Sequence, residues 1–203
     1  MRAATHDGDP TVRAVAVAAL VRAAPVRIAA PAWDAAAADP AAAVRRRAAE
    51  LAPALAGRRR TPDPGAETAL VNLLRDADVT VVEAAAWALG ETGAAAASAD
   101  AVTALARVAQ THDDALAREA AVAALGAIGD PAGLDAVLAG CADKPAVRRR
   151  AVLALAPFEG PAVDAAIERA LGDRDWQVRQ AAEDLRDAGA PDEDDEVSAT
   201  SGP

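Results

Sequence analysis

A short phrase recurs six times along the chain, and it constrains the fold more than any other feature. It reads as an acidic residue, often Pro, then Val-Arg and an Ala-rich stretch ending on Leu. Successive copies lie 30 to 37 residues apart, measured at Val12, Val44, Val81, Ala117, Val147 and Val178. Periods of this length are typical of chains that stack one supersecondary unit repeatedly. We therefore predict a repeat architecture.

The phrase has the chemistry of a helix start and a helix stop. An Asp side chain accepts hydrogen bonds from the first helical turn, and Pro fits the next position. Leu-Gly, as at Leu89-Gly90, provides a residue that readily ends a helix. A second helix is predicted after each of the first five copies, most clearly near 67–75, 100–110, 131–140 and 161–171. Because Ala, the best helix former, is also abundant, we predict an all-α fold.

Neither helix of such a hairpin can bury its apolar side without neighbours, so the hairpins should stack. We predict one repeat domain over residues 1–188, with hairpins starting near 9, 39, 78, 114 and 144 and a polar capping helix from 175. Pro25 and Pro31 predict a broken or kinked second helix in the first unit. The acidic residues 189–203 have almost no apolar anchors, which predicts a disordered tail.

The Asp-x-Asp-Pro/Trp-x-Val-Arg openings and the Ala-Leu-Gly endings resemble the HEAT repeat. The resemblance covers about residues 7–188 and is to the short variety named after the phycobilisome lyases. It implies a right-handed α-solenoid of about five and a half hairpins. On function it says little, since such repeats serve many roles.

No sequence pattern indicates catalysis. His6 and His112 are the only histidines, and both are expected to be solvated or to bond at a helix start. Enzymes resembling deoxyhypusine hydroxylase hold iron with His-Glu pairs, which are absent from this sequence. Cys141 is expected to be a small residue at a helix end. We predict no catalytic residue, metal or cofactor, and keep an enzyme or accessory subunit of the lyase or hydroxylase type as an alternative.

Composition suggests where the protein resides. No apolar run is long enough to span a bilayer, and the first residues lack the apolar stretch of a signal peptide. A single Cys agrees with a reducing cytoplasm, where we expect the protein. Abundant Ala, Arg and Asp with little Lys is typical of a GC-rich bacterial genome.

The recurring Arg has two interpretations. Five arginines at one repeat position could bind phosphate, but in HEAT-like stacks this position usually pairs with acids of the same or the adjacent layer. We favour a structural ladder, which Val82 interrupts in the third unit. Its predicted members are Asp9, Arg13, Asp39, Arg45, Asp114, Arg118, Arg148, Asp175 and Arg179.

A second group of arginines exceeds what the ladder or a helix end needs. Residues 1–60 carry a net charge of +5, whereas 61–190 carry −10 and the tail −5. The group could bind an acidic protein segment, a phosphate backbone or the chain's own acidic tail. The overall charge of −10 disfavours nucleic acid, which remains an alternative partner. The group consists of Arg46, Arg47, Arg58, Arg59 and Arg60.

The main functional hypothesis is a non-catalytic adaptor whose concave face docks another protein or peptide. We expect the second helices to line that face, with Asn72, Arg75, Thr103, Arg107, Asp135, Asp164, Glu168 and Arg169 as candidate contacts. An exposed Trp would mark a binding hot spot. Trp87 is a candidate for the core, and the ring of Trp176 is expected to pack against the preceding layer. The first helix, with few polar faces, is expected to pack on another chain, as in a homodimer, or on an upstream repeat.

Overall fold

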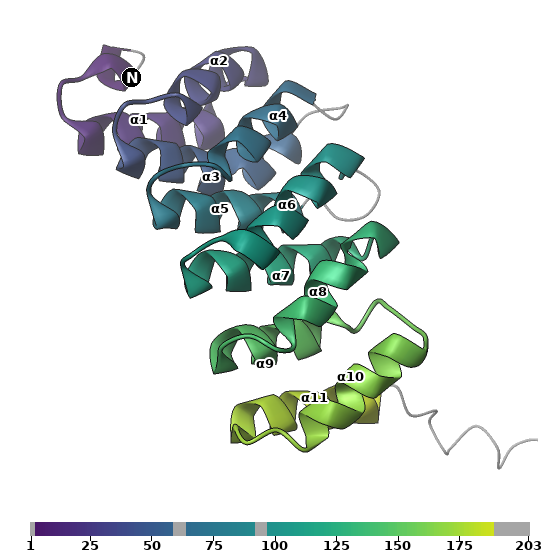
Figure 1. The fold of residues 1–203 in the computed structure, drawn as a ribbon. Coiled ribbons are helices and arrows are strands. Elements are labelled where there is room, and N and C mark those ends of the chain that lie inside the picture. Colours follow the sequence, from purple (N-terminus) through teal and green to yellow (C-terminus); the bar gives the residue numbers. More distant parts are fainter. Residues whose placement is uncertain (1–2, 59–63, 92–96, 189–203) are drawn as a thin grey trace, which may run out of the picture.

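The computed structural model describes residues 3–58, 64–91 and 97–188, and in these ranges every regular element is helical. The predicted all-α solenoid is confirmed (Figure 1). The first helices of the units are α1 (Pro10–Ala23), α3 (Ala42–Ala56), α5 (Val79–Gly90), α7 (Ala115–Ile128), α9 (Pro145–Ala154) and α11 (Trp176–Ala188). The second helices are α2 (Val26–Ala37), α4 (Pro64–Leu73), α6 (Ala99–Thr111), α8 (Leu134–Gly140) and α10 (Pro161–Leu171). Short 3-10 helices lie at η1 (Ala3–His6) and η2 (Pro131–Gly133).

Aspartate side chains start most of the first helices. Asp9 accepts a hydrogen bond from the N–H of Thr11 at 2.7 Å, and Asp78 accepts one from Thr80 at 2.9 Å. Asp114 and Asp175 make the equivalent bonds before α7 and α11. Each bond satisfies an N–H group that the first helical turn leaves without a partner. The recurring opening of the sequence therefore places the helix starts.

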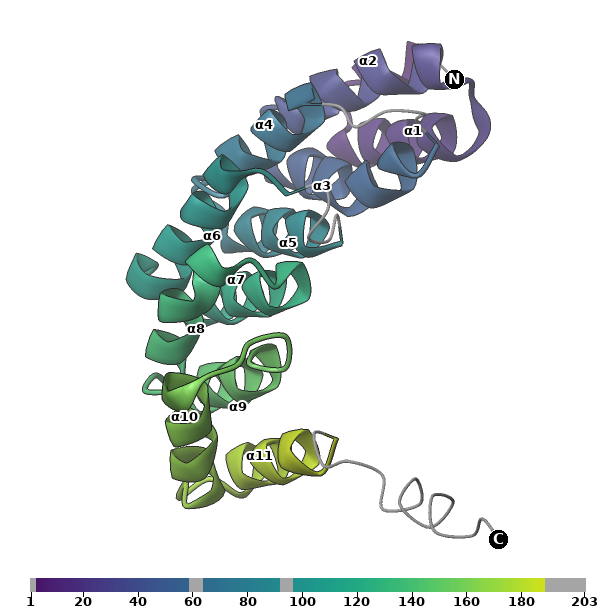
Figure 2. The ribbon, with the colours of Figure 1, turned by 90° about the vertical axis from the view of Figure 1, so that its right-hand side faces the viewer.

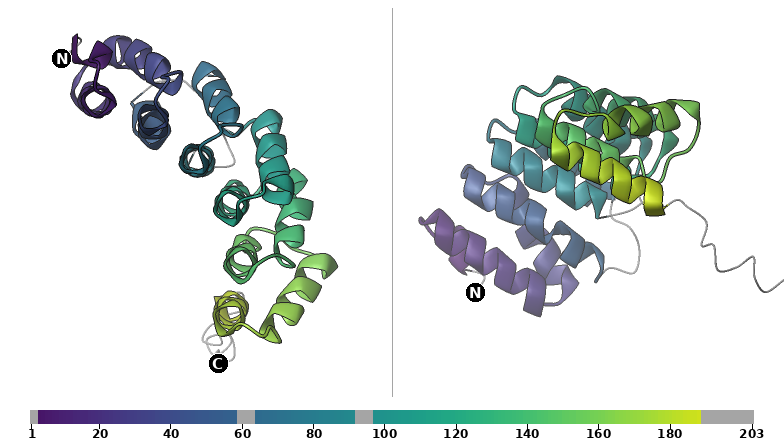
Figure 3. Two further views of the ribbon diagram at one scale, coloured as in Figure 1. Left: turned by 60° about the vertical axis from the view of Figure 1, so that its left-hand side comes forward. Right: turned by 90° about the horizontal axis from the view of Figure 1, so that it is seen from below.

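The helices form two layers, and the stack is curved. The first helices lie side by side on the inner, concave side, and the second helices lie on the outer, convex side (Figures 2 and 3). The expectation that second helices line the concave face is therefore wrong. The first helices pack against one another more extensively than the second helices do.

Small residues explain why the first helices form the inner layer. At Gly126 of α7, an added Cβ would lie 2.6 Å from the Cβ of Ala154 in α9. At Gly90 of α5, it would lie 3.0 Å from the Cα of Ala124 in α7. Such close backbone approach is open only to glycine. These contacts keep successive repeat units close together on the side of the first helices. The stack therefore bends toward that side.

The helix containing Pro31 is continuous, so of the predicted break or kink the break does not occur. Pro25 lies just before the first residue of α2, where its missing N–H removes no helical bond. Pro31 lies inside α2 and is exposed. On the opposite side of the helix, Ala29 and Trp33 are fully buried, and the indole N–H of Trp33 donates to the carbonyl of Ala48 at 2.6 Å. We infer that this packing compensates for the one helical bond that Pro31 cannot make.

The other two tryptophans are exposed, which corrects both expectations about them. Trp87 on α5 is 47% exposed and is not a core residue. Trp176, at the start of α11, is 64% exposed, so its ring is not buried against the preceding layer. The core consists instead of aliphatic side chains such as Leu89, Leu125 and Leu155. In the first repeat unit, Val12 and Val15 of α1 are also exposed.

Candidate functional site

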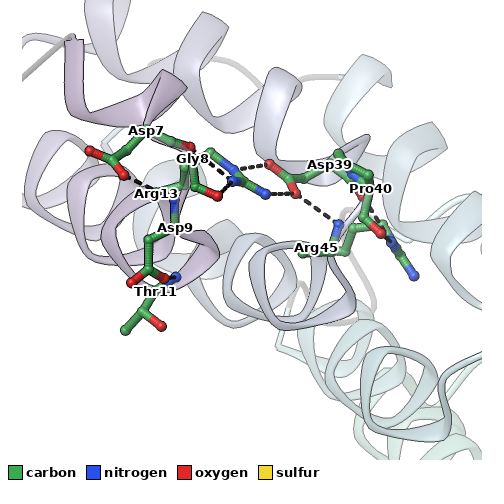
Figure 4. Close-up of polar contacts among 9 residues, drawn as sticks. Asp7, Gly8, Asp9, Thr11, Arg13, Asp39, Pro40 and Arg45 are labelled. Carbon is green, nitrogen blue, oxygen red and sulfur yellow. Dashed lines mark hydrogen bonds and ion pairs between the residues drawn. The ribbon is translucent and has the colours of Figure 1, made fainter.

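An arginine–aspartate pair joins the first repeat unit to the second (Figure 4). The Nε and Nη2 groups of Arg13 donate to the two carboxylate oxygens of Asp39 at 2.8 and 2.7 Å. The Nη1 group of Arg13 donates to the backbone carbonyl of Asp7 at 2.9 Å. Asp39 also accepts a hydrogen bond from the N–H of Ala41. Each residue of the pair thus holds the loop before its own helix while it binds the neighbouring layer.

The same two-point contact recurs between other layers. Bidentate hydrogen bonds of 2.6 to 2.8 Å join Arg45 to Asp76, Arg118 to Asp143, and Arg148 to Asp173. Sequence reasoning identified the arginines but not Asp76, Asp143 and Asp173. A signal was present, because each of these three stands five or six residues before the ladder position of its own unit.

In these contacts, the recurring arginines bind aspartates of the chain itself. Of the predicted ladder aspartates, Asp39 alone bonds an arginine side chain among the described residues, whereas Asp9, Asp114 and Asp175 cap their own helices. In each of the four observed pairs, the hydrogen bond from arginine is the main reason why the pKa of the aspartate, at Asp39, Asp76, Asp143 and Asp173, lies below its usual value. The side chains of all four bonded arginines are at most 19% exposed. At the last copy, Arg179 donates to the backbone carbonyl of Asp173 at 2.8 Å but has no carboxylate partner among the described residues.

The predicted arginine cluster is also largely engaged within the chain. Arg58 donates to the backbone carbonyls of Val21 and Ala24, which lie at the end of α1. Arg46 and Arg47 both form ion pairs with Glu50, at 3.3 and 2.8 Å. The remaining two members, Arg59 and Arg60, and the acidic tail lie outside the described residues.

The predicted concave contacts lie on the convex layer. All eight are exposed, and they belong to α4, α6, α8 and α10 or, for Arg75, to the turn after α4. The structure does not bring them together on the concave face. They are Asn72, Arg75, Thr103, Arg107, Asp135, Asp164, Glu168 and Arg169.

The concave face carries a groove of about 650 Å³ across the middle of the stack. Its lining comes from α3, α5, α7 and α9 and from Glu91, directly after α5. Six of its lining residues are small: Ala84, Gly90, Ala120, Ala123, Ala124 and Ala127. The remaining lining residues are Arg46, Glu50, Thr80, Glu83, Trp87, Glu91, Leu116, Glu119 and Arg150.

Two large apolar side chains stand out in this groove. Trp87 on α5 is 47% exposed, and Leu116 on the neighbouring helix α7 is 54% exposed. Sequence reasoning did not identify them as one surface. The available signal was that Glu83 and Trp87, and likewise Leu116 and Glu119, are one helical turn apart and so share a helix face.

The groove also has an excess of negative charge. Glu50 pairs with Arg46, and Glu119 pairs more loosely with Arg150 at 3.6 Å. Glu83 and Glu91 are exposed and form no ion pair among the described residues. Among the described residues, these two carboxylates of the groove therefore have no cation partner.

The sequence candidates for chemistry lie apart from this groove. His6 is in η1, and the Nδ1 of His112 accepts a hydrogen bond from the N–H of Asp114 at 3.1 Å. Burial raises the pKa of the Cys141 thiol to about 11. Residues 3–58, 64–91 and 97–188 contain no group of three or more His, Cys, Asp or Glu side chains arranged to hold a metal. None of their helices combines the length and the apolarity needed to cross a bilayer.

Comparison with known proteins supports the fold. Residues 94–156 and 110–186 match the HEAT repeats, and residues 63–91 match the armadillo/beta-catenin-like repeat. No curated protein matches the chain in sequence. Two crystal structures of engineered proteins share 21% identity with it, with TM-scores of 0.59 and 0.60. They cover 92% and 91% of this chain, and 95% and 94% of their own chains.

A structure of human deoxyhypusine hydroxylase in complex with glycerol is more distant. It shares 20% identity, covers 90% of this chain and 81% of its own, and has a TM-score of 0.44. The two engineered structures, at higher TM-scores, support a repeat fold common to most of this chain.

Proposed function

Because the chain is a HEAT-like repeat protein, we propose that it is a non-catalytic scaffold that binds another protein in its concave groove. The observation that carries this proposal is the pair of exposed apolar side chains, Trp87 and Leu116, in a groove of about 650 Å³. Grooves of a few hundred cubic ångströms suit the burial of ligand side chains. Exposed tryptophan is among the residues that contribute most to binding energy at protein interfaces.

The charges elsewhere favour the groove over the arginines as the binding surface. Four of the ladder arginines hold aspartates, and Arg46, Arg47 and Arg58 have partners within the chain. A phosphate backbone would have to displace these contacts. The groove needs no such rearrangement, since Trp87 and Leu116 already face solvent.

The test is capture of partners by the tagged full-length protein from the lysate of its native host, with nuclease added. A variant with Trp87→Ala and Leu116→Ala removes the apolar pair, and a matched variant with Thr103→Ala and Arg107→Ala alters the convex layer. We expect a near-stoichiometric protein partner that the groove variant loses and the convex variant keeps. Circular dichroism of all three proteins shows that the fold is intact.

Two results would contradict the proposal. Recovery that depends on nucleic acid would favour the alternative nucleic-acid function. Equal capture by the groove variant would place the binding surface elsewhere on the stack.

A further inference from the structure

We propose that the groove binds a short peptide segment in which a large aliphatic or aromatic side chain is flanked by Lys or Arg. This inference rests on the proposed function and specifies the partner of the same groove. Two independent features of the groove carry it: the exposed apolar side chains of Trp87 and Leu116, and two glutamates that form no ion pair among the described residues.

Trp87 and Leu116 determine which peptide side chain can be buried in the groove; we call this side chain the anchor. Trp87 and Leu116 line the groove from the neighbouring helices α5 and α7, and six of the other lining residues are alanine or glycine. Because these six side chains are small, the groove has room for an incoming side chain beside Trp87 or Leu116. Because burying apolar surface is favourable in proportion to its area, a large aliphatic or aromatic residue gains more there than a small or polar one.

The carboxylates of Glu83 and Glu91 determine which peptide residues are favoured beside the anchor. Glu83 lies one turn before Trp87 on α5, and Glu91 lies one turn after it. Acidic groups therefore stand before and after Trp87, one on α5 and one at its C-terminal cap. Lys or Arg on either side of the anchor would meet these charges, and Arg could bind a carboxylate through two hydrogen bonds.

The same charges argue against other occupants. Lining residues of the groove include four glutamates and two arginines, so it carries a net charge of −2. Residues 189–203 contain five acidic residues and no basic one, and like charges would repel them from this surface. A phosphate backbone would be repelled for the same reason.

The experiment is selection of random 12-residue peptides on the full-length protein, with counter-selection on the Trp87→Ala, Leu116→Ala variant. We expect the enriched peptides to contain a Leu, Ile, Phe or Trp flanked by Lys or Arg. Fluorescence anisotropy of a labelled enriched peptide then gives its Kd for each variant. Trp176→Ala, which removes an exposed tryptophan outside the groove, is the matched control.

The expected changes differ by variant. Trp87→Ala should weaken binding about thirtyfold, as at an interface hot spot. Glu83→Gln and Glu91→Gln should each weaken it about threefold, because the pairs are exposed, and less so at high salt. Trp176→Ala should leave the Kd unchanged.

Several outcomes would overturn the inference. They are enrichment of acidic peptides, enrichment without an apolar anchor, no enrichment at all, equal affinity of Trp87→Ala, or dimers of this chain that block the groove. If the lysate partner is still captured through the groove in any of these cases, the scaffold function stands and only the assigned peptide chemistry fails. If groove-dependent capture fails as well, the scaffold function fails too.

Discussion

Val82 and His112 occupy the positions that an arginine and an aspartate hold in the ion pairs between other layers. Val82 is fully buried at the ladder position of α5. His112 lies six residues before Arg118, as Asp39 lies before Arg45, and its Nδ1 accepts a backbone hydrogen bond as the carboxylate of Asp39 does. Both partners of the pair are replaced together, so neither leaves an unpaired charge.

This relationship predicts coupling between the two positions. Val82→Arg alone should lower the free energy of unfolding by about 2 kcal/mol, because the new guanidinium would be buried without a carboxylate. Val82→Arg with His112→Asp should recover most of that loss. Urea denaturation of both single variants and the double variant measures the coupling. Additive effects would show that the two positions do not meet across the layers.

A second prediction separates the inner copies of the ladder from the last one. Arg148→Gln removes the two hydrogen bonds that the carboxylate of Asp173 accepts from arginine, which should lower the free energy of unfolding by about 2 kcal/mol. Arg179→Gln removes only a bond to a backbone carbonyl and should cost less than about 1 kcal/mol. Thermal or urea unfolding of the two variants tests this order. Equal losses of unfolding free energy in the two variants would mean that the bonds between Arg148 and Asp173 add no stability beyond that of a bond to a backbone carbonyl.

The ladder also predicts a dependence of stability on pH. The pKa values of Asp39, Asp76, Asp143 and Asp173 are lowered in the folded state, chiefly by hydrogen bonds from arginine. Their contribution is therefore present above the unfolded pKa of about 4 and is lost as the pH falls through the folded values. We expect the free energy of unfolding to decrease below about pH 4. In the Arg148→Gln variant the decrease should be smaller, and an unchanged acid profile would contradict the prediction.

A fourth prediction concerns the close contact of α7 with α9. Gly126→Ala would place a methyl group 2.6 Å from the Cβ of Ala154, so the two helices would have to separate. We expect a loss of about 1 to 3 kcal/mol in the free energy of unfolding. Gly8→Ala, where a methyl group would meet nothing within 4 Å, is the control and should be nearly neutral. Small-angle X-ray scattering of Gly126→Ala should show a change in curvature, which the control should lack.

Much of the fold follows from contacts between residues close in sequence. Asp9, Asp78 and Asp114 each bond an N–H two residues later, so their effect on a helix start can be read without knowing the rest of the molecule. The ladder arginines were visible as a periodic position. Their aspartate partners lie 25 to 31 residues away, and only the stacking of layers brings the two together.

The groove is where sequence reasoning failed, because several sides of a first helix are apolar. Trp87 lies on the same helix as the buried residues Val82 and Leu89, and periodicity alone does not tell which of these meets a neighbour. The exposure of Trp87 and Leu116 depends on how α5 and α7 are rotated in the stack. The glycine contact of Gly90 with Ala124 shows how closely these two helices approach each other.

Sequence alone thus predicts the helices, their approximate starts and the repeat that stacks them, because hydrogen bonds and apolar periodicity within a few residues govern those features. The direction of curvature, the helices that line the concave side and the residues that meet in the groove depend on the spacing between layers. Contacts such as Gly126 with Ala154 set that spacing, and they join residues far apart in the chain. For this reason the adaptor hypothesis could be reached from the sequence, while the groove that we propose as its binding surface became visible only in the packed structure.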